Sequence, residues 1–323
     1  MTALGLGLAT PVAAQSSVDW SGLAYLDYAY LLASDDAEAV GDNSFDYRRI
    51  YLTADARLDD AFRMRVRLEA KGSSTTGSGR PAPFVKDAWL RWDYSEAGHR
   101  AVLGVQPPPL FDVTEAVWGY RSLEKTVMDR VDARDSRDFG LRVDGPVAGP
   151  LSYGVMVANG NGVRPDPDGA PGKRVYGQLR LAPEGPFRAT LGADVTADDA
   201  LGAEGGTSVR VSALAGAVTE AFHGGVEVFS LRLDPDAVAE TTSEGVGVSA
   251  FGAVAVSPWL ELVARYDYVE ADAGDAGADA HYALAAVAYQ PSPAVRLMPN
   301  LVVTRLDGAA ASVLGRFTVH VDF

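Results

Sequence analysis

Charged residues recur at every second position in one part of the chain, which is the spacing of one face of a β-strand. In the segment 62–71 they alternate strictly with apolar residues, so a strand would separate the two kinds completely, whereas a helix would mix them. A row of cations beside water can attract and orient anions. We predict a basic wall made of Arg49, Arg57, Arg63, Arg65, Arg67, Lys71, Arg91 and Arg142.

The segment 107–136 supplies charges of both signs that could face this wall. A connection of that length in a compact fold is usually functional. We expect it to fold inward, with a short helix over 121–131. Opposed charges on wall and loop would set a transverse field at a constriction; the alternative is that arginine simply solvates a wet surface. The predicted constriction residues are Asp112, Glu115, Arg121, Glu124, Lys125, Asp129 and Arg130.

Residues for other chemistry are few. The chain has no cysteine, which excludes disulfides, thiolate metal sites and a cysteine nucleophile. The four histidines, His99, His223, His281 and His320, do not have the spacing of metal ligands. A hydrolase would need a serine beside a histidine, and nothing in the sequence orients such a pair. We therefore predict no catalytic site, no metal and no cofactor.

Composition limits the class of protein. Of 323 residues, 47% are hydrophobic and 22% are charged, so the chain is not mostly disordered. A formal net charge of -15 argues against nucleic acid as a partner. After the N-terminal segment, no apolar stretch is long enough for a transmembrane helix. Much of the acidic excess falls in predicted outside loops, at Asp35, Asp36, Glu38, Asp42, Asp166, Asp168, Asp198, Asp199, Glu270, Asp272, Asp275 and Asp279.

Alternation of apolar and polar residues predicts sixteen strands. A short connection follows every even strand and a longer one every odd strand. Outer-membrane barrels have this pattern, with tight periplasmic turns and longer outside loops, whereas a Greek-key sandwich has no reason for it. The predicted fold class is all-β, a transmembrane antiparallel up-and-down β-barrel whose third loop folds inward. The predicted strands are 18–31, 45–58, 62–71, 85–94, 100–106, 137–144, 151–159, 174–181, 187–196, 207–218, 222–232, 244–256, 260–269, 281–289, 294–304 and 312–323.

Aromatic residues gather at the strand ends beside the short connections. Such a girdle marks the membrane interface of outer-membrane barrels. The alternative is that aromatic residues favour strand ends near turns in any β-protein. The residues of the predicted girdle are Phe62, Trp92, Tyr94, Phe187, Phe222, Trp259, Tyr289 and Phe323.

Both ends of the chain have patterns that predict targeting signals. The segment 1–14 is uncharged, small and apolar, and Val12-Ala13-Ala14 fits a signal-peptidase site. We predict a signal peptide over 1–14 and a barrel over 15–323. Phe323 closes an alternating strand, which resembles the terminal signal of bacterial outer-membrane barrels. The expected partners are the barrel-assembly machinery, through Phe323, and the lipid and lipopolysaccharide of the outer membrane.

Three stretches carry a resemblance to a known family. They are RRIYLTADARLDDAFRMRVRLEA (48–70), KDAWLRWDY (86–94) and GYRSLEKTVMDRV with SRDFGLRVDG (119–145). They resemble the phosphate-selective porin O/P family, over roughly residues 45–160 and the last strand. The resemblance implies a trimeric, water-filled, sixteen-stranded channel for small anions, with an arginine ladder and a lysine cluster at its constriction.

The resemblance applies unevenly to the site residues. An arginine ladder could be supplied by Arg49, Arg57, Arg63, Arg65, Arg67 and Arg91. A lysine cluster is doubtful, because the chain has only Lys71, Lys86, Lys125 and Lys173. Phosphate selectivity is therefore not carried over.

The function predicted from the sequence is passive diffusion of small hydrophilic solutes or ions across a bacterial outer membrane. Pore size and charge, set by the basic wall and the loop 107–136, would give selectivity. A substrate-specific anion channel with stacked sites would use the same architecture. From other classes, a barrel-embedded hydrolase or an adhesin anchor are the alternatives.

Overall fold

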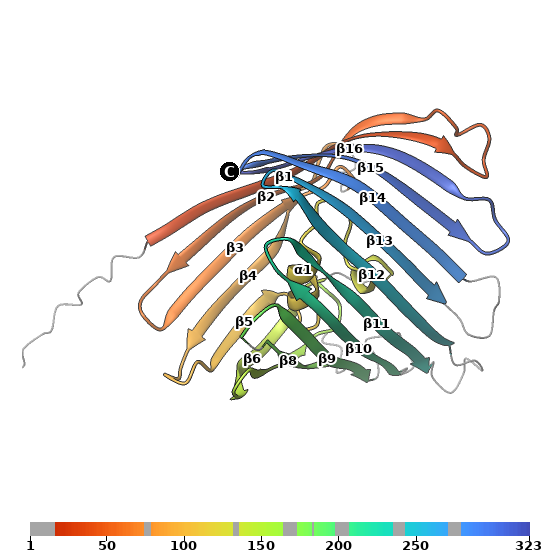
Figure 1. Cartoon of the computed structure of the whole chain (residues 1–323). Coiled ribbons are helices and arrows are strands. Elements are labelled where there is room, and N and C mark those ends of the chain that lie inside the picture. Colours follow the sequence, from red (N-terminus) through yellow and green to blue (C-terminus); the bar gives the residue numbers. More distant parts are fainter. Residues whose placement is uncertain are drawn as a thin grey trace, which may run out of the picture.

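A computed structural model of the protein describes residues 17–73, 79–131, 136–163, 173–182, 184–197, 207–234, 243–270 and 279–323. Sixteen antiparallel strands form one closed barrel, in which each strand pairs with its neighbours in sequence and β16 pairs with β1 (Figure 1). The predicted fold class is confirmed. The predicted signal peptide, 1–14, and the acidic residues predicted at 166–168, 198–199 and 272–275 lie outside the described residues.

All sixteen predicted strands are present, with ends within four residues of the prediction. Those on one half of the barrel are β1 (Ser17–Ala33), β2 (Asn43–Arg57), β3 (Phe62–Ala70), β4 (Phe84–Asp93), β5 (Arg100–Gln106), β6 (Asp138–Ala148), β7 (Leu151–Ala158) and β8 (Arg174–Leu181). The others are β9 (Phe187–Ala197), β10 (Thr207–Val218), β11 (Phe222–Asp234), β12 (Ser243–Ser257), β13 (Leu260–Glu270), β14 (Asp279–Ser292), β15 (Val295–Leu306) and β16 (Ser312–Asp322).

The two faces of the wall differ as the alternation predicts. On β9, Leu191 points outward and is 57% exposed, whereas Asp194 points inward and is 2% exposed. An apolar outer face would be unfavourable in water, and it fits a barrel whose outside meets hydrocarbon. Closure also pairs the backbone groups of β1 and β16, which would otherwise be unpaired at an edge. No helix in the described part of the chain is long and apolar enough to cross a membrane.

The register of β2 and β3 follows from the short turn between them. Asp55 faces Arg65, and Arg57 faces Arg63, as the turn at 59–61 requires. One strand further, Arg63 also faces Arg91, so three arginines stand side by side across three strands.

Two irregularities in the pairing change which side chains point inward. The pairing of β1 with β2 shifts between Tyr25 and Leu26, which makes Arg48 an extra residue. The pairing of β3 with β4 shifts after Arg67, and Lys86 and Asp87 are both buried although they are consecutive. An extra residue in one strand re-aims its side chains, which strict alternation cannot anticipate.

The connection between β5 and β6 folds into the barrel, where Figure 1 shows α1 enclosed by the strands. It contains α1 (Asp112–Trp118) and α2 (Val127–Val131). The predicted single helix over 121–131 is therefore wrong in its first half. Gly119, with φ of 69°, ends α1. The stretch that follows is irregular, because side chains of the wall and of α1 bind its carbonyl groups in place of helical N–H donors.

Candidate functional site: the constriction of the lumen

Apolar contacts hold the inward-folded loop against one side of the lumen. Val117, Trp118, Tyr120 and Leu123 are almost completely buried. They belong to a cluster whose wall residues, from β10 and β12 to β15, are Leu214, Phe251, Ala253, Val263, Tyr282, Leu284, Ala286, Ala288, Met298 and Val302.

A second apolar cluster holds both ends of the loop. Its loop members are Leu110, Phe111, Val127 and Met128. Their partners on β7, β8, β11 and β13 are Met156, Ala158, Tyr176, Phe229 and Val269. Together the two clusters cover the wall from β7 to β15, so the loop's apolar face is buried there.

The uncovered side of the lumen, mainly β2 to β5, is rich in cations that share few carboxylates. Glu69 is completely buried and has three cations around it, with Arg49 at 2.8 Å, Lys86 at 3.3 Å and Lys71 at 4.0 Å. Each distance joins a side-chain nitrogen to a carboxylate oxygen. The carboxylate can neutralise only one of the three charges.

An excess of cations over carboxylates also occurs on the neighbouring strand β4. Asp87 forms ion pairs with Arg67 at 3.3 Å and with Arg137 at 2.5 Å. Among the described residues, and together with the Glu69 group, five cations thus surround two carboxylates on adjacent strands. In these two groups basic side chains outnumber acidic ones.

The remaining predicted wall residues have one-to-one or looser pairing. Arg65 pairs with Asp55 at 2.7 Å and Arg91 with Asp93 at 2.6 Å. Arg57 pairs with Asp60 in the short turn.

Arg63 and Arg142 differ sharply in their surroundings. Arg63 is exposed beside two other arginines, Arg57 and Arg91. Arg142 is buried and binds Asp144 at 2.8 Å and Asp112 of the loop at 2.6 Å. The structure thus places the predicted wall residues on one continuous side, with Arg57 at its rim and Arg142 at its far edge.

Within the loop, charges of opposite sign mostly satisfy one another. Arg121 binds both Glu115 and Asp129 at 2.6 Å, and Lys125 approaches Asp129 at 3.4 Å. Burial alone would raise the pKa of Asp129, but Arg121 and Lys125 outweigh it and hold that pKa below its usual value. The loop therefore does not present a bare acidic face to the wall.

Two other predicted loop residues point elsewhere. Arg130 turns to the covered wall, where it binds Asp267 at 3.2 Å and lies over the ring of Tyr282 at 4.5 Å. A side-chain oxygen of Glu124 accepts a hydrogen bond from the backbone N–H of Lys125.

Two hollows lie along the uncovered side, one toward each end of the barrel. The first, of about 240 Å³, opens toward the long connections and is lined by Tyr25, Arg48, Arg49, Lys71, Ser73, Arg121, Glu124 and Lys125. The second, of about 170 Å³, opens toward the short turns and is lined by Arg65, Trp89, Arg91, Arg100, Val102, Gln106, Pro107, Asp112, Arg142 and Asp144. Between them lies the row of cations on β2 to β4.

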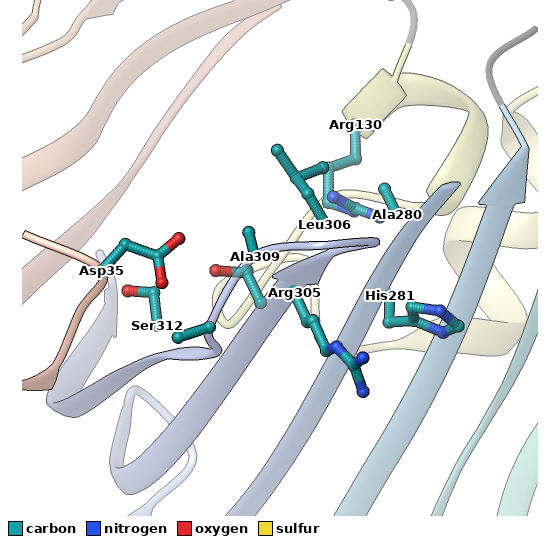
Figure 2. Close-up of a pocket in the computed structure, with 10 residues that line it drawn as sticks. Asp35, Arg130, Ala280, His281, Arg305, Leu306, Ala309 and Ser312 are labelled. Atoms are coloured by element: carbon teal, nitrogen blue, oxygen red, sulfur yellow. The ribbon is translucent and has the colours of Figure 1, made fainter. Parts of the chain in front are cut away.

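A third hollow of about 230 Å³ lies at the mouth formed by the long connections. Figure 2 shows Asp35 and Arg130 on opposite sides of it, with Arg305 and His281 from neighbouring strands. It is a mixed-charge vestibule beyond the constriction.

Several residues of the constriction were missed by sequence reasoning. Lys86 and Arg48 face inward only because of the pairing irregularities, and Arg137 is the first residue of the predicted strand 137–144. Arg265 and Arg316 are on late strands whose small residues gave a weaker alternation. The one available signal was an arginine among apolar neighbours, which points inward in the part of a barrel wall that meets hydrocarbon.

The chain matches the family model for Gram-negative porins over residues 1–309, and it belongs to that family. No curated protein sequence matches it. Among solved structures it is similar to the anion-selective porin from Comamonas acidovorans, with 14% identity and a TM-score of 0.74, covering 96% of this chain and 100% of that one. The outer membrane channel DcaP of Acinetobacter baumannii is also similar, with 14% identity and a TM-score of 0.69 over 98% and 99% of the two chains.

The family defines the class of protein and its location. The protein is a channel of the bacterial outer membrane for small solutes. In that setting the short turns are periplasmic and the long connections are extracellular.

Proposed function

We propose that this porin passes small anions in preference to cations, and that the β2–β4 side of its constriction sets the preference. The observation that carries the proposal is a charge count among the described residues of that side, where five cations surround Glu69 and Asp87. A ring or row of fixed positive charge at a narrow point attracts anions and repels cations.

Anions would enter from the extracellular hollow, where three partly exposed cations, Arg48, Lys71 and Lys125, stand around the opening. They would pass Arg67, whose side chain is 18% exposed, and leave through the periplasmic hollow beside Arg65 and Arg91. Because each cation keeps a carboxylate nearby, no site binds an anion too tightly to release it.

Two likenesses support the proposal without deciding it. The solved structure from Comamonas acidovorans is described as an anion-selective porin. The stretches at 48–70 and 86–94 resemble phosphate-selective porins, and Lys71 and Lys125 both line the extracellular hollow. Two lysines are a small cluster, so we propose a general preference for small anions, with phosphate selectivity left aside.

We further propose a homotrimer, embedded in outer-membrane lipid and lipopolysaccharide and made from a precursor whose residues 1–14 are removed. A trimer form of the similar OmpT of Vibrio cholerae is known. Phe323 closes the seam, because its backbone exchanges hydrogen bonds with Gly22 of β1. We propose that the assembly machinery reads this end of the chain.

The test is the zero-current potential of purified protein in a planar bilayer with a salt gradient across it. The wild-type channel is expected to prefer chloride over potassium, and the triple variant R63Q/R65Q/R67Q is expected to shift toward cations. The matched control is R63K/R65K/R67K, which keeps the charge and should keep the preference. Cation preference in the wild type, or equal potentials in all three proteins, would refute the proposal. A current that saturates at low anion concentration would instead favour the substrate-specific channel.

A further inference from the structure

The irregular segment 122–125, between the two loop helices, has an unusual set of hydrogen-bond partners. All four of its consecutive carbonyl groups accept hydrogen bonds from side chains. Arg48 donates to the carbonyl groups of Ser122 and Leu123, the latter at 2.9 Å. Arg316 also donates to the Leu123 carbonyl, at 2.6 Å. Trp118 donates to the Glu124 carbonyl at 2.8 Å, and Arg265 donates to that of Lys125. Three of these donors are arginines from three separate strands, β2, β13 and β16.

Each of the three arginines is also held by an acceptor on the wall. Arg265 donates from Nε and Nη2 to Asp267, at 2.8 and 2.7 Å, and its Nη1 is the atom that reaches the loop. Arg316 donates from Nε to Asn300 at 3.0 Å and from Nη2 to the loop. Arg48 in the same way binds Asp27 and the loop. One guanidinium thus joins wall and loop in each case.

The acceptors on the wall are themselves fixed. Asp267 accepts a hydrogen bond from Ser249 at 2.6 Å, and Asp27 accepts one from Thr318 at 2.5 Å. Asn300 donates to the same Thr318 at 3.2 Å. Asp267, Asp27 and Asn300 are therefore fixed on the barrel wall. A guanidinium that is hydrogen-bonded to one of them can hold the loop in a fixed position.

We propose that Arg48, Arg265 and Arg316, here called the arginine clamp, are positioning residues that fix the tip of the constriction loop and so keep the open channel at one width. In this role they act as planar forks of donors, and for Arg265 and Arg316 this is the main contribution. Arg265 shows this most clearly, because its side chain and that of Asp267 are both 0% exposed and no passing ion can touch them. The unpaired carbonyl groups of an irregular segment need donors, and the clamp supplies them.

Substitution by lysine separates the positioning role from the role of charge, because lysine keeps the positive charge of arginine but lacks the planar set of donors. A lysine ammonium is a single compact donor group on a flexible stem, so it cannot hold a wall acceptor and a loop carbonyl in one plane. The double variant R265K/R316K therefore keeps every charge in the lumen and removes two of the three clamps. Arg48 is left intact, because it also lines the extracellular hollow.

The experiment records single channels of R265K/R316K in planar bilayers, with the single variant R316K in case the double variant folds poorly. We expect open-channel current noise to rise several-fold and the spread of conductance levels to widen, with an unchanged zero-current potential. Hydrogen exchange of the 119–126 backbone should become faster in the same folded protein.

The matched control is R188K, because Arg188 donates to the carbonyl groups of Gly185 and Phe187 beside a short turn and is bonded to no loop carbonyl among the described residues. It should keep the noise of the wild type. Wild-type noise and exchange in both clamp variants would overturn the proposal, and so would an equal rise in R188K. The inference rests on this loop forming the constriction but is independent of the anion preference, which the zero-current potential reports separately.

Discussion

The two sides of the lumen differ in how their inward-facing side chains meet water: those on one side are charged and hydrated, and those on the other are apolar and covered by the loop. From β2 to β5, inward positions carry charges that stay beside water, such as Arg65 and Arg67. On β14, the inward positions Tyr282, Leu284 and Ala286 are apolar or aromatic and are buried under the constriction loop. Both sides alternate with the same period, and both are outwardly apolar.

The comparison shows that the loop packs where the inward face of the barrel is apolar and its exposure to water would be unfavourable. Leaving an apolar inward face in water would forgo its burial energy, which is about 25 cal/mol per Å². Covering the charged side would instead require desolvating many cations that share few carboxylates. The loop therefore packs on β7 to β15, and the passage is displaced to the other side.

The largest effect is expected when the apolar attachment is removed. Trp118 is 0% exposed and packs edge-on against Phe251, with ring centroids 5.4 Å apart. The substitution W118A should cost about 3–5 kcal/mol at that contact. Release of the loop should raise single-channel conductance and lower the unfolding temperature of the barrel.

A matched tryptophan on the outer face provides the control. Trp92 is 48% exposed and stacks on Phe62 at the periplasmic end of β3 and β4. W92A should leave conductance at the wild-type value, because the side chain lies on the outer face of the barrel and not in the lumen. If W118A and W92A changed conductance alike, apolar docking of the loop on the covered side would be the wrong explanation.

A smaller effect is expected from the ion pairs inside the loop. Asp129 binds Arg121 at 2.6 Å, so D129N leaves a buried guanidinium with one carboxylate, Glu115. A buried charge that loses a hydrogen-bond partner costs about 1–3 kcal/mol. D129N should therefore destabilise the loop less than W118A does. Hydrogen exchange of the 112–131 backbone, compared between the two variants, measures this difference.

The same carboxylate predicts a direction of pH dependence. The pKa of Asp129 is lowered in the folded protein, so its contribution is complete above the unfolded value of about 3.9 and is lost as pH falls through the folded pKa. Protection of the loop backbone, taken as its exchange rate relative to the intrinsic rate at each pH, should be independent of pH near neutrality and fall below about pH 4. D129N should remove that fall, and an equal fall in D129N would assign it to other groups.

The strands were predictable because alternation is a local property of the chain. Segments such as 62–71 separate charges from apolar residues within ten positions, and the alternating connection lengths then select a barrel. The register of Asp55 with Arg65 followed from the turn between their strands. These features need no knowledge of distant contacts.

The covered side and the clamp were not predictable for the opposite reason. Whether an apolar inward position such as Leu284 meets water or a loop depends on a segment far away in sequence. The inward aim of Arg48 and Lys86 depends on irregular pairing with a neighbouring strand. Helix α1 was missed because its seven residues are fixed mainly by packing inside the barrel.

One pair of variants tests most directly the claim that a single side of the lumen selects ions. R67Q and R210Q each remove one positive charge from an inward position. Arg67 is 18% exposed on the uncovered side, and Arg210 is 5% exposed on β10, near Asp194. We predict that R67Q shifts the zero-current potential toward cations while R210Q keeps the wild-type value. Equal shifts in both variants, or a shift in R210Q alone, would contradict the account.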